Sequence, residues 1–393
     1  MTSGPRPATT TDVVTTALEL VGAASVSPDA GPAAKILAAV LESHGFAVSV
    51  DDWGNTLGHI DFGPGPTVLF DAHIDTVEVG DRSRWTHDPA GELVGDRIVG
   101  RGIVDTKGPL AAAITAAHRM VGQPGLGGRL VISGSVDEEL AEGPSLGRIL
   151  DDVNPDVVVI GEPSANTLRI GQRGRAEVEV EIIGASSHSA FPESGINAVE
   201  VMAEVIIALR DLPLRTDPHV GTGLLTLVSI RSEPYPSQST VPSRCVAVFD
   251  RRTVVGESDT TILDDIGAVV ESVAHEYGAG SVTRLARARW QTWRGRNVDV
   301  PIYAPAWYEE PQEWPVTDVM AALRRNDFDA TIGTWKFCTH GSESAGRRSI
   351  PTVGFGPGDP GQAHTPDESM SLAELRAGVE GYRAIFSALL VAR

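Results

Sequence analysis

Short apolar runs that alternate with helical patterns dominate the first 172 residues of this 393-residue chain. Strand-like runs are predicted at 46–50, 67–71, 129–135 and 156–161. Apolar residues recur at helical spacing over 12–22, 31–45 and 109–120. Helices that alternate with apolar strands indicate a largely parallel sheet with helices on both faces. We therefore predict an α/β fold whose main domain contains a doubly covered, mostly parallel sheet.

The pattern changes after Gly171. Residues 173–290 predict a strand, a helix, two strands, a helix and a final strand, which is typical of an inserted α+β domain with antiparallel pairing. The segment 291–316 is rich in proline and aromatic residues and has no period, so we expect an irregular crossing. A helix, a strand, a loop and a helix follow. Residues 1–172 and 291–393 are thus predicted to form one domain, interrupted by the insert at 173–290.

Acidic and imidazole side chains stand at the ends of the strand-like runs. In chain order they are His73 and Asp75, Asp105, Glu138 and Glu139, Glu162, and His364. Ligand sites in open α/β sheets collect at the carboxyl ends of the strands, and His73, Glu138 and Glu162 fall at or just past such ends. The set can hold two divalent metal ions and keep one carboxylate for proton transfer. This composition predicts a two-metal hydrolase.

Each of these motifs has a plainer interpretation when it is taken alone. A His-x-Asp pair often arises by chance, two consecutive glutamates are typical of an exposed loop, and a histidine in a glycine- and proline-rich loop is usually a surface residue. The glycine-rich turn at Asp105 could cradle a phosphate, but it lacks the GxGxxG spacing and the lysine followed by serine or threonine. Glu162 follows an apolar run, where an uncompensated carboxylate is costly unless it is paired or metal-bound.

The charge balance excludes two classes of partner. The chain has 52 acidic and 32 basic side chains, so its field repels nucleic acid and anionic membranes. The arginines within 284–296 are therefore assigned to an outer strand of the insert. The N-terminal 20 residues contain no export signal, and no window is apolar enough to span a membrane. Cys245 and Cys338 form no disulfide framework, so we expect a cytoplasmic protein.

The motifs HIDTV, GRGIVDTKG, DEE, GEPS and AHTP together resemble those of the co-catalytic metallo-aminoacylase and carboxypeptidase superfamily. This group includes acetylornithine deacetylase, succinyl-diaminopimelate desuccinylase and glutamate carboxypeptidase. Within it, DTVEVGD, WTHDP, FDRRT and GFGPG…QAHTP look most like the YgeY-type hydrolases. The resemblance covers the chain from about residue 12 to the C-terminus. It implies that the insert is a lid and dimerisation domain, and hence that the protein is a homodimer.

The resemblance also implies a cofactor of two divalent metal ions. Zinc is the first choice, and carboxylate and imidazole ligands suit cobalt and manganese as well. His73, Asp105 and Glu162 would hold one ion, and Asp105, Glu139 and His364 the other, with Asp105 as the bridge. A cis peptide bond after Asp105 is implied too.

Three further residues receive catalytic roles. Asp75 lies two positions after His73, on the same side of a strand, and would orient it by accepting a ring proton. Glu138 would be the general base that takes a proton from water and returns it to the leaving nitrogen. His188 in SSHSAFP would stabilise the oxyanion from the lid of the partner subunit. Without the resemblance, His188 is better interpreted as the cap of a turn.

The candidates for substrate binding are Arg173, Arg252, His340 and Asn197. A guanidinium group matches a carboxylate with two parallel hydrogen bonds, so we expect a small substrate that bears a carboxylate. Either arginine fits an ion pair that fixes the domains equally well. His340 stands where an asparagine is expected in the nearest relatives, and this difference prevents a direct transfer of substrate identity.

We therefore predict a metal-dependent hydrolase of the linear amide bond in an N-acyl amino acid or a small peptide. Hydrolysis of an amidine, ureido or aryl-amine group, or deamination, is an alternative that the same site could perform. A catalytically silent binding or regulatory protein is a third interpretation. It requires a broken ligand set, and none of the expected positions is missing.

Overall fold

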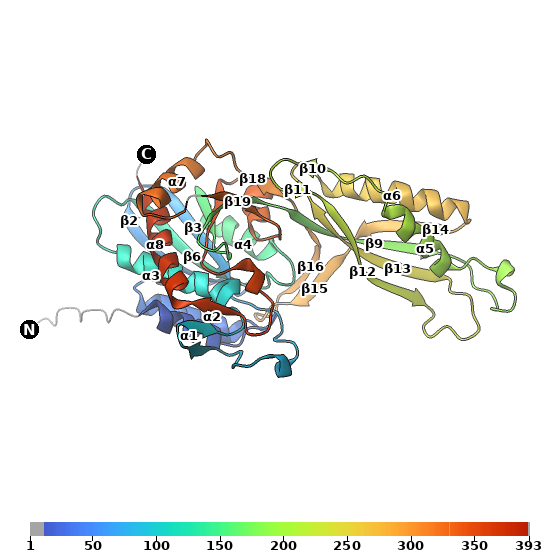
Figure 1. Cartoon of the computed structure of the whole chain (residues 1–393), viewed down its shortest axis with the longest axis horizontal. Coiled ribbons are helices and arrows are strands. Elements are labelled where there is room, and N and C mark those ends of the chain that lie inside the picture. The colour runs from blue at the N-terminus through green and yellow to red at the C-terminus, as the bar shows by residue number, and fades with distance from the viewer. Residues whose placement is uncertain (1–11, 330, 392–393) are drawn as a thin grey trace, which may run out of the picture.

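The computed structural model describes residues 12–329 and 331–391. The first 11 residues, on which the absence of an export signal partly rests, lie outside the described residues. Figure 1 shows an elongated molecule with a larger body that contains both the first and the last helix, and a smaller body built from the middle of the chain. None of the described helices is both long and apolar enough to cross a membrane.

The larger body is built on a sheet that has nine strands among the described residues. Their order is β1 (Ala47–Val50), β2 (Thr56–Gly63), β6 (Gly128–Ser135), β3 (Thr67–His73), β7 (Val157–Ile160), β20 (Thr352–Gly354), β8 (Leu168–Gln172) and β18 (Trp307–Tyr308), with β19 (Ile332–Trp335) beside β8. The central strands β6, β3, β7 and β20 are mutually parallel. Antiparallel pairs flank them on both sides. The predicted parallel sheet is thus confirmed, with β6, β3, β7 and β20 as its centre.

Helices cover both faces of this sheet, as predicted. On one face lie α1 (Val13–Gly22), α2 (Gly31–Ser43), α3 (Gly108–Met120), α7 (Val316–Arg325) and α8 (Leu372–Leu389). On the other lies α4 (Pro144–Val153). Successive residues of β3 alternate between the two cores: Phe70 packs against the aromatic rings of α8, and Leu69 packs with α4. Helix α3 begins with Pro109 in its first turn and is almost entirely buried.

Two small sheets lie beside the large sheet. One consists of β4 (Glu92–Val94), β5 (Arg97–Val99) and β21 (Ser369–Ser371). The other is the hairpin of β10 (Thr216–Asp217) and β11 (Gly221–Thr222). The first brings the segment after His364 next to the loop that carries Asp105, although the two are distant in sequence.

The smaller body, here called the lid, has its own antiparallel sheet and core. Its strands run in the order β12 (Leu224–Glu233), β13 (Arg244–Thr253), β9 (Gly174–Ile183) and β14 (Gly280–Leu285), and β17 (Tyr303–Ala304) extends β9. Helices α5 (Ala198–Leu209) and α6 (Asp259–Glu276) cover one face (Figure 1). Ser258 begins α6 with a reciprocal capping box to Thr261. Along β9 the apolar side chains point into this core, and the glutamates between them lie on the opposite face.

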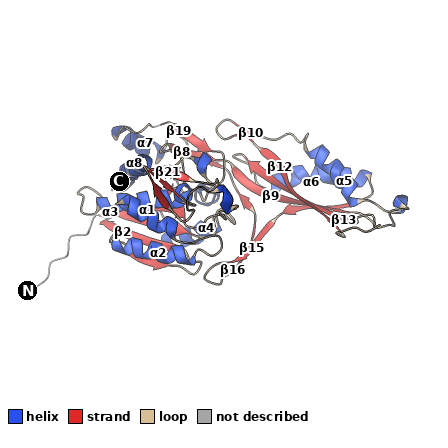
Figure 2. Cartoon of the chain, turned by 60° about the horizontal axis from the view of Figure 1, so that its bottom comes forward, coloured by secondary structure: helices blue, strands red, loops and turns tan. Residues whose placement is uncertain are grey.

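One segment differs from the prediction. The chain from 287 to 301 is neither an outer strand of the lid nor an irregular crossing. It forms a separate hairpin of β15 (Arg287–Gln291) and β16 (Asn297–Pro301), here called the arm. The arm extends from the lid toward the larger body (Figure 2). Its strands are short, and β15 alternates arginines with alanine and tryptophan, so sequence pattern alone did not separate it from the lid sheet.

Candidate active site

The predicted metal ligands meet at one edge of the parallel sheet. In the register of β3 and β6, His73 pairs with Ser135, and the chain continues from Ser135 to Glu138 and Glu139. Strand β7 ends beside the same edge, and Glu162 follows it. The parallel direction therefore brings groups that are far apart in sequence to one place.

Two loops complete the cluster. Asp105 lies in the irregular turn Ile103–Lys107 before α3, and its peptide bond to Thr106 is cis. His364 lies in the loop after β20, with a positive φ of 61°. The cis bond is the one that the family resemblance implies.

The two carboxylate oxygens of Asp105 face different partners. Its Oδ1 lies 2.9 Å from Nε2 of His73, and its Oδ2 lies 3.1 Å from Nε2 of His364. His73 Nε2 is also 3.8 Å from Glu162 Oε1, and His364 Nε2 is 3.1 Å from Glu139 Oε1. Ligand atoms of His73, Asp105 and Glu139 all lie within 4.8 Å of one another. The cluster thus has two halves that share Asp105.

The electrostatics of this cluster leave negative charge uncompensated. Burial, followed by repulsion from neighbouring carboxylates, raises the pKa of Glu138 and of Glu162 well above the usual value. Burial acts in the same direction on Asp105, but hydrogen bonds with His364 and His73 outweigh it and lower its pKa. Among the described residues, no lysine or arginine forms an ion pair with the carboxylates of the cluster, which are those of Asp105, Glu138, Glu139 and Glu162. The donor set of carboxylate and imidazole groups therefore fits divalent cations.

His73 is oriented in a slightly different way from the prediction. The nearest acceptor for its Nδ1 is the backbone oxygen of Asp75 at 2.9 Å, and the Asp75 carboxylate is farther away, at 3.7 Å. That carboxylate instead accepts hydrogen bonds from Ser27 Oγ (2.5 Å) and from the backbone N–H groups of Glu138 (3.3 Å) and Glu139 (3.2 Å). Asp75 therefore holds the turn that contains Glu138 and Glu139, here called the glutamate turn, as well as His73.

The position of Asp105 depends on a buried ion pair that the sequence did not reveal. Glu368 Oε2 accepts a 2.7 Å hydrogen bond from Arg101, and its Oε1 accepts backbone N–H groups of Gly102, Val104 and Asp105 at 3.1, 2.8 and 3.3 Å. Both side chains are buried. Glu368 comes four residues after His364, in HTPDE, and this proximity was the one available signal.

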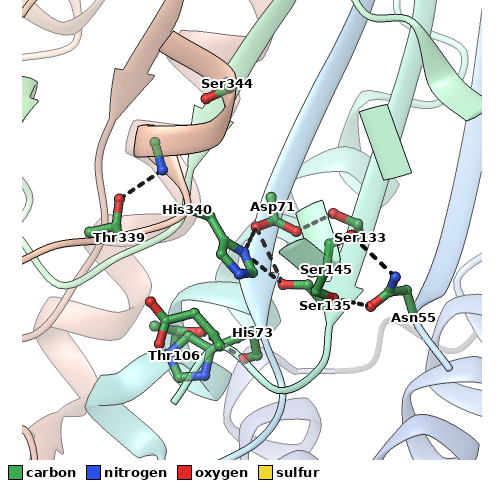
Figure 3. A network of polar contacts seen from close by, with 12 residues as sticks. Asn55, Asp71, His73, Thr106, Ser133, Ser135, Ser145, Thr339, His340 and Ser344 are labelled. Atoms are coloured by element: carbon green, nitrogen blue, oxygen red, sulfur yellow. Dashed lines mark hydrogen bonds and ion pairs between the residues drawn. The ribbon is translucent and has the colours of Figure 1, made fainter. Parts of the chain in front are cut away.

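His340 does not reach the substrate space. Its side chain is 2% exposed, and its Nδ1 lies 2.8 Å from Asp71 Oδ2. Ser133 Oγ donates to the other Asp71 oxygen at 2.5 Å, and Ser135 Oγ lies 3.2 Å from His340 Nδ1. Figure 3 shows His340 inserted between Asp71 and Ser135, close to His73. The predicted role of His340 in substrate binding is not supported, because the ring packs against the strand ends below the site and does not line the cavity.

A cavity of about 460 Å³ opens above the cluster. Its lining combines the cluster carboxylates with residues from the lid and from the returning chain: Val77, Asp105, Glu138, Glu139, Glu142, Glu162, Pro163, Arg175, Arg252, Phe337, Cys338, Pro360, Ala363 and His364. The size suits a small molecule.

The two arginines proposed for substrate binding have different positions. Arg252 lines the cavity, and its Nε donates to Asp250 at 2.8 Å. Arg173 instead donates to the backbone oxygen of Val220 in the turn of the β10–β11 hairpin and does not line the cavity, so its assignment to substrate binding is not supported. Arg175 lines the cavity in its place. Arg173 lies at the break between β8 and β9, whereas Arg175 lies within β9.

His188 and Asn197 lie away from this cavity in their own chain. Arg175, near the start of β9, lines the cavity, and the eight residues from there to the end of the strand correspond to about 26 Å. The exposed His188 follows that far end, where its Nδ1 accepts the N–H of Ala190 at 3.0 Å. Asn197 is the N-cap of α5, and its side chain accepts the N–H of Val199. Its assignment to substrate binding is not supported.

Comparisons with known proteins agree with the geometry. The sequence matches peptidase family M20/M25/M40 over residues 69–388. It is 32% identical over 354 residues to the uncharacterized protein YgeY of Escherichia coli K12, which covers 88% of this chain and 86% of YgeY. It is 26% identical to succinyl-diaminopimelate desuccinylase 2 of Ruegeria sp. TM1040, with 70% and 74% covered.

Solved structures share the fold over almost the whole chain. A tripeptidase from Staphylococcus aureus has a TM-score of 0.77 at 18% identity, covering 97% of this chain and 99% of that one. The YXEP protein of Bacillus subtilis, described as a dinuclear metal-binding peptidase of the M20 family, has a TM-score of 0.72 at 14% identity, covering 96% of this chain and 97% of that one. The resemblance stated from the motifs is thus confirmed. The chain belongs to peptidase family M20/M25/M40 and is a metal-dependent hydrolase of amide bonds.

Proposed function

We propose that this protein is a dinuclear hydrolase that cleaves the linear amide bond of an N-acyl amino acid or a small peptide. The observation that carries the proposal is the division of Asp105, whose two oxygens each face a separate imidazole and carboxylate pair. One half contains His73 and Glu162, and the other contains Glu139 and His364. Zinc, cobalt or manganese suits each half.

When bound, such ions lower the pKa of a water molecule toward about 7 and polarise the carbonyl group to be cleaved. The residues of this chain hold the ions at a fixed separation and move the proton. Glu138 lines the cavity beside the cluster. It accepts a proton from the attacking water and delivers it to the leaving nitrogen. The raised pKa of Glu138, caused by burial and by the surrounding carboxylates, suits this exchange.

The substrate carboxylate is assigned to Arg252. The Arg252 side chain is 29% exposed, and its two side-chain hydrogen bonds both go to the carboxylate of Asp250, which leaves other N–H donors of the guanidinium group for a substrate. Arg175 is engaged by three carboxylates, those of Glu142, Glu177 and Asp250. It therefore serves to fix the lid against the larger body, and Arg252 is the better donor for a substrate.

The oxyanion donor is assigned to His188 of the partner subunit in a homodimer. Two observations support this assignment. His188 is exposed at the far end of the lid, where its own site is out of reach. The edge strand β12 also exposes Leu227, Val228 and Ile230, an apolar row that a second lid would cover.

The cytoplasm remains the proposed location, because both cysteines are buried and free. Hydrolysis of an amidine or ureido group, or deamination, is the competing reaction, since the same cluster could attack those carbons. A silent binding protein is the other competitor, and the complete cluster argues against it.

Screening the metal-loaded protein against N-acyl amino acids, N-carbamoyl amino acids and dipeptides separates these functions. Our proposal predicts that an N-acyl amino acid or a dipeptide yields equal amounts of free amine and carboxylate without ammonia. Turnover of only the N-carbamoyl amino acids, which releases ammonia and carbon dioxide, would support the ureido alternative, and ammonia released from the other two classes would support the deaminase alternative. Turnover of neither N-acyl amino acids nor dipeptides with zinc, cobalt or manganese would refute the proposed amide hydrolase.

A further inference from the structure

The turn that carries Glu138 has an unusual backbone and, besides the contact with Asp75, a support from outside the larger body. Asp137, the residue before Glu138, has a φ of 62°, a left-handed conformation that aspartate tolerates better than most side chains. Asp137 is 1% exposed. Its backbone oxygen accepts the N–H groups of Leu140 and Ala141, which closes the turn. The orientation of Asp137 therefore sets the direction of both following glutamates.

The outside support comes from the arm. Trp290 on β15 donates its indole N–H to Asp137 Oδ2 at 2.8 Å. The other oxygen of Asp137 is buried and has no partner, so within the described chain Trp290 is the sole side-chain donor to this carboxylate. A buried carboxylate that loses its last donor is costly, and the turn would rearrange to hydrate it.

A second contact joins the arm to the same strand end. Trp293 donates to the backbone oxygen of Gly54 at 3.2 Å. A β-carbon on Gly54 would lie 2.0 Å from the Trp293 ring, so only glycine permits this approach. The side chain of the next residue, Asn55, accepts the N–H of Val136 at 3.0 Å. Trp290 thus contacts Asp137 directly, and Trp293 contacts the residue next to Asn55, whose side chain holds Val136.

The base of the arm belongs to the lid. Ala286 donates to the backbone oxygen of Glu177 on β9, and Ile302 donates to Ala286. The arm is therefore tied to the lid sheet at its base and to the glutamate turn of the larger body near its tip (Figures 1 and 2).

We propose that Trp290 is a positioning residue for Glu138, which acts by holding Asp137 in its left-handed turn. This inference rests on the proposed role of Glu138 as the general base. It assigns the arm a function in the reaction, because the arm fixes Glu138 relative to the metal-binding cluster. Since the arm is attached to the lid, the direction of the Glu138 side chain then depends on the position of the lid.

The test is a double-mutant cycle on this hydrogen bond. Trp290→Phe keeps the ring and removes the donor, and Asp137→Gly removes the acceptor while it retains the positive φ. Each variant is expected to lower kcat by about 10- to 100-fold with KM changed less than about threefold, because a hydrogen bond to a buried carboxyl group is lost and the substrate contacts remain. The double variant should lose no more than either single one. Arg289→Gln, at an exposed position of the same strand, is the matched control and should keep wild-type kcat.

A readout independent of turnover is amide hydrogen exchange in residues 136–142. We expect faster exchange in Trp290→Phe and Asp137→Gly, with the metal content of the wild type. Asp137→Gly leaves the arm intact and carries the test if Trp290→Phe fails to fold. Wild-type kcat and exchange in both variants, additive losses in the double variant, or loss of metal together with activity would overturn the proposal. If the wild type itself hydrolyses no amide, the proposed function fails, and the exchange experiment still decides the role of Trp290.

Discussion

Glutamates of the lid and glutamates of the active site have opposite surroundings. On the outer face of the lid sheet, Glu179 and Glu181 each form ion pairs with Arg284, and Glu181 also pairs with Arg244. A hydrogen bond from Arg244 is the main reason why the pKa of Glu181 is lowered. At the site edge, burial raises the pKa of Glu162. Arginines of the lid compensate the negative charge of its glutamates, whereas the carboxylates of the site have no such partner and suit bound cations.

The largest effect on this difference between lid and site is expected from a substitution of Asp105, the carboxylate that the two halves of the cluster share. Asp105→Asn removes the charge that both halves of the cluster use, so we expect loss of both metals and undetectable activity. Elemental analysis of the purified variant measures the first effect. The matched control is Glu179→Gln in the lid, which should keep metal and activity. Retention of a full metal complement in Asp105→Asn would contradict the assignment.

The two consecutive glutamates should respond differently to the same change. Glu138→Gln should lower kcat by about 10²- to 10⁴-fold and leave the metal content nearly unchanged, because only proton transfer is lost. Glu139→Gln should weaken the binding of the metal ion that His364 also holds. Steady-state kinetics with metal analysis on both variants checks this pair, and the reverse pattern would exchange the two roles.

Mixed dimers test whether the lid of one subunit completes the site of the other. His188→Ala and Glu138→Gln homodimers should each be nearly inactive. A mixed dimer contains one site with both residues intact, so random reassortment should restore roughly 25% of wild-type activity under two-fold symmetry. Mixed dimers isolated by two affinity tags and still inactive would exclude His188 as a donor in trans.

The pH dependence of metal binding follows from His364. Hydrogen bonds to Asp105 and Glu139 raise its pKa to about 10 in the metal-free protein. A metal ion must displace that proton, so affinity should rise with pH, by up to about tenfold per unit below this pKa. Titration calorimetry in buffers of different ionisation enthalpy measures the proton released. Binding that is independent of pH and releases no proton would contradict this description of the site.

The smallest expected effect belongs to the lid. Glu181→Gln should lower the free energy of unfolding by at most about 1 kcal/mol, because its ion pairs are partly exposed. The folded-state pKa of Glu181 is lowered, so its contribution is present above the unfolded pKa and is lost as the pH falls through the folded pKa. Denaturant unfolding at neutral and acidic pH measures the difference, which should disappear in acid.

The sequence predicted the parts of the molecule that depend on local pattern. The central parallel strands and the alternating lid strands have strong periods, and the order of the motifs brought His73, Asp105 and Glu139 into one expected cluster. The contacts that fix the cluster are long-range. Arg101 and Glu368 are 267 positions apart, and Asp71 and His340 are 269 apart. No pattern within either segment indicates the other.

Substrate binding was harder to predict for the same reason. Arg173 and Arg175 are two positions apart, but Arg173 contacts the β10–β11 hairpin and Arg175 lines the cavity, a difference that depends on partners far away in the sequence. The arm escaped prediction because its strands pair only with each other.

The most direct test of the account is a crystal structure of the metal-loaded protein with the ions located by anomalous scattering. We predict two ions per chain, roughly 3.5 to 4 Å apart, with one oxygen of Asp105 on each. His73 and Glu162 should complete one coordination sphere, and Glu139 and His364 the other. A single ion at full metal loading, or Asp105 beyond coordination distance of either ion, would contradict the shared site on which the proposed function rests.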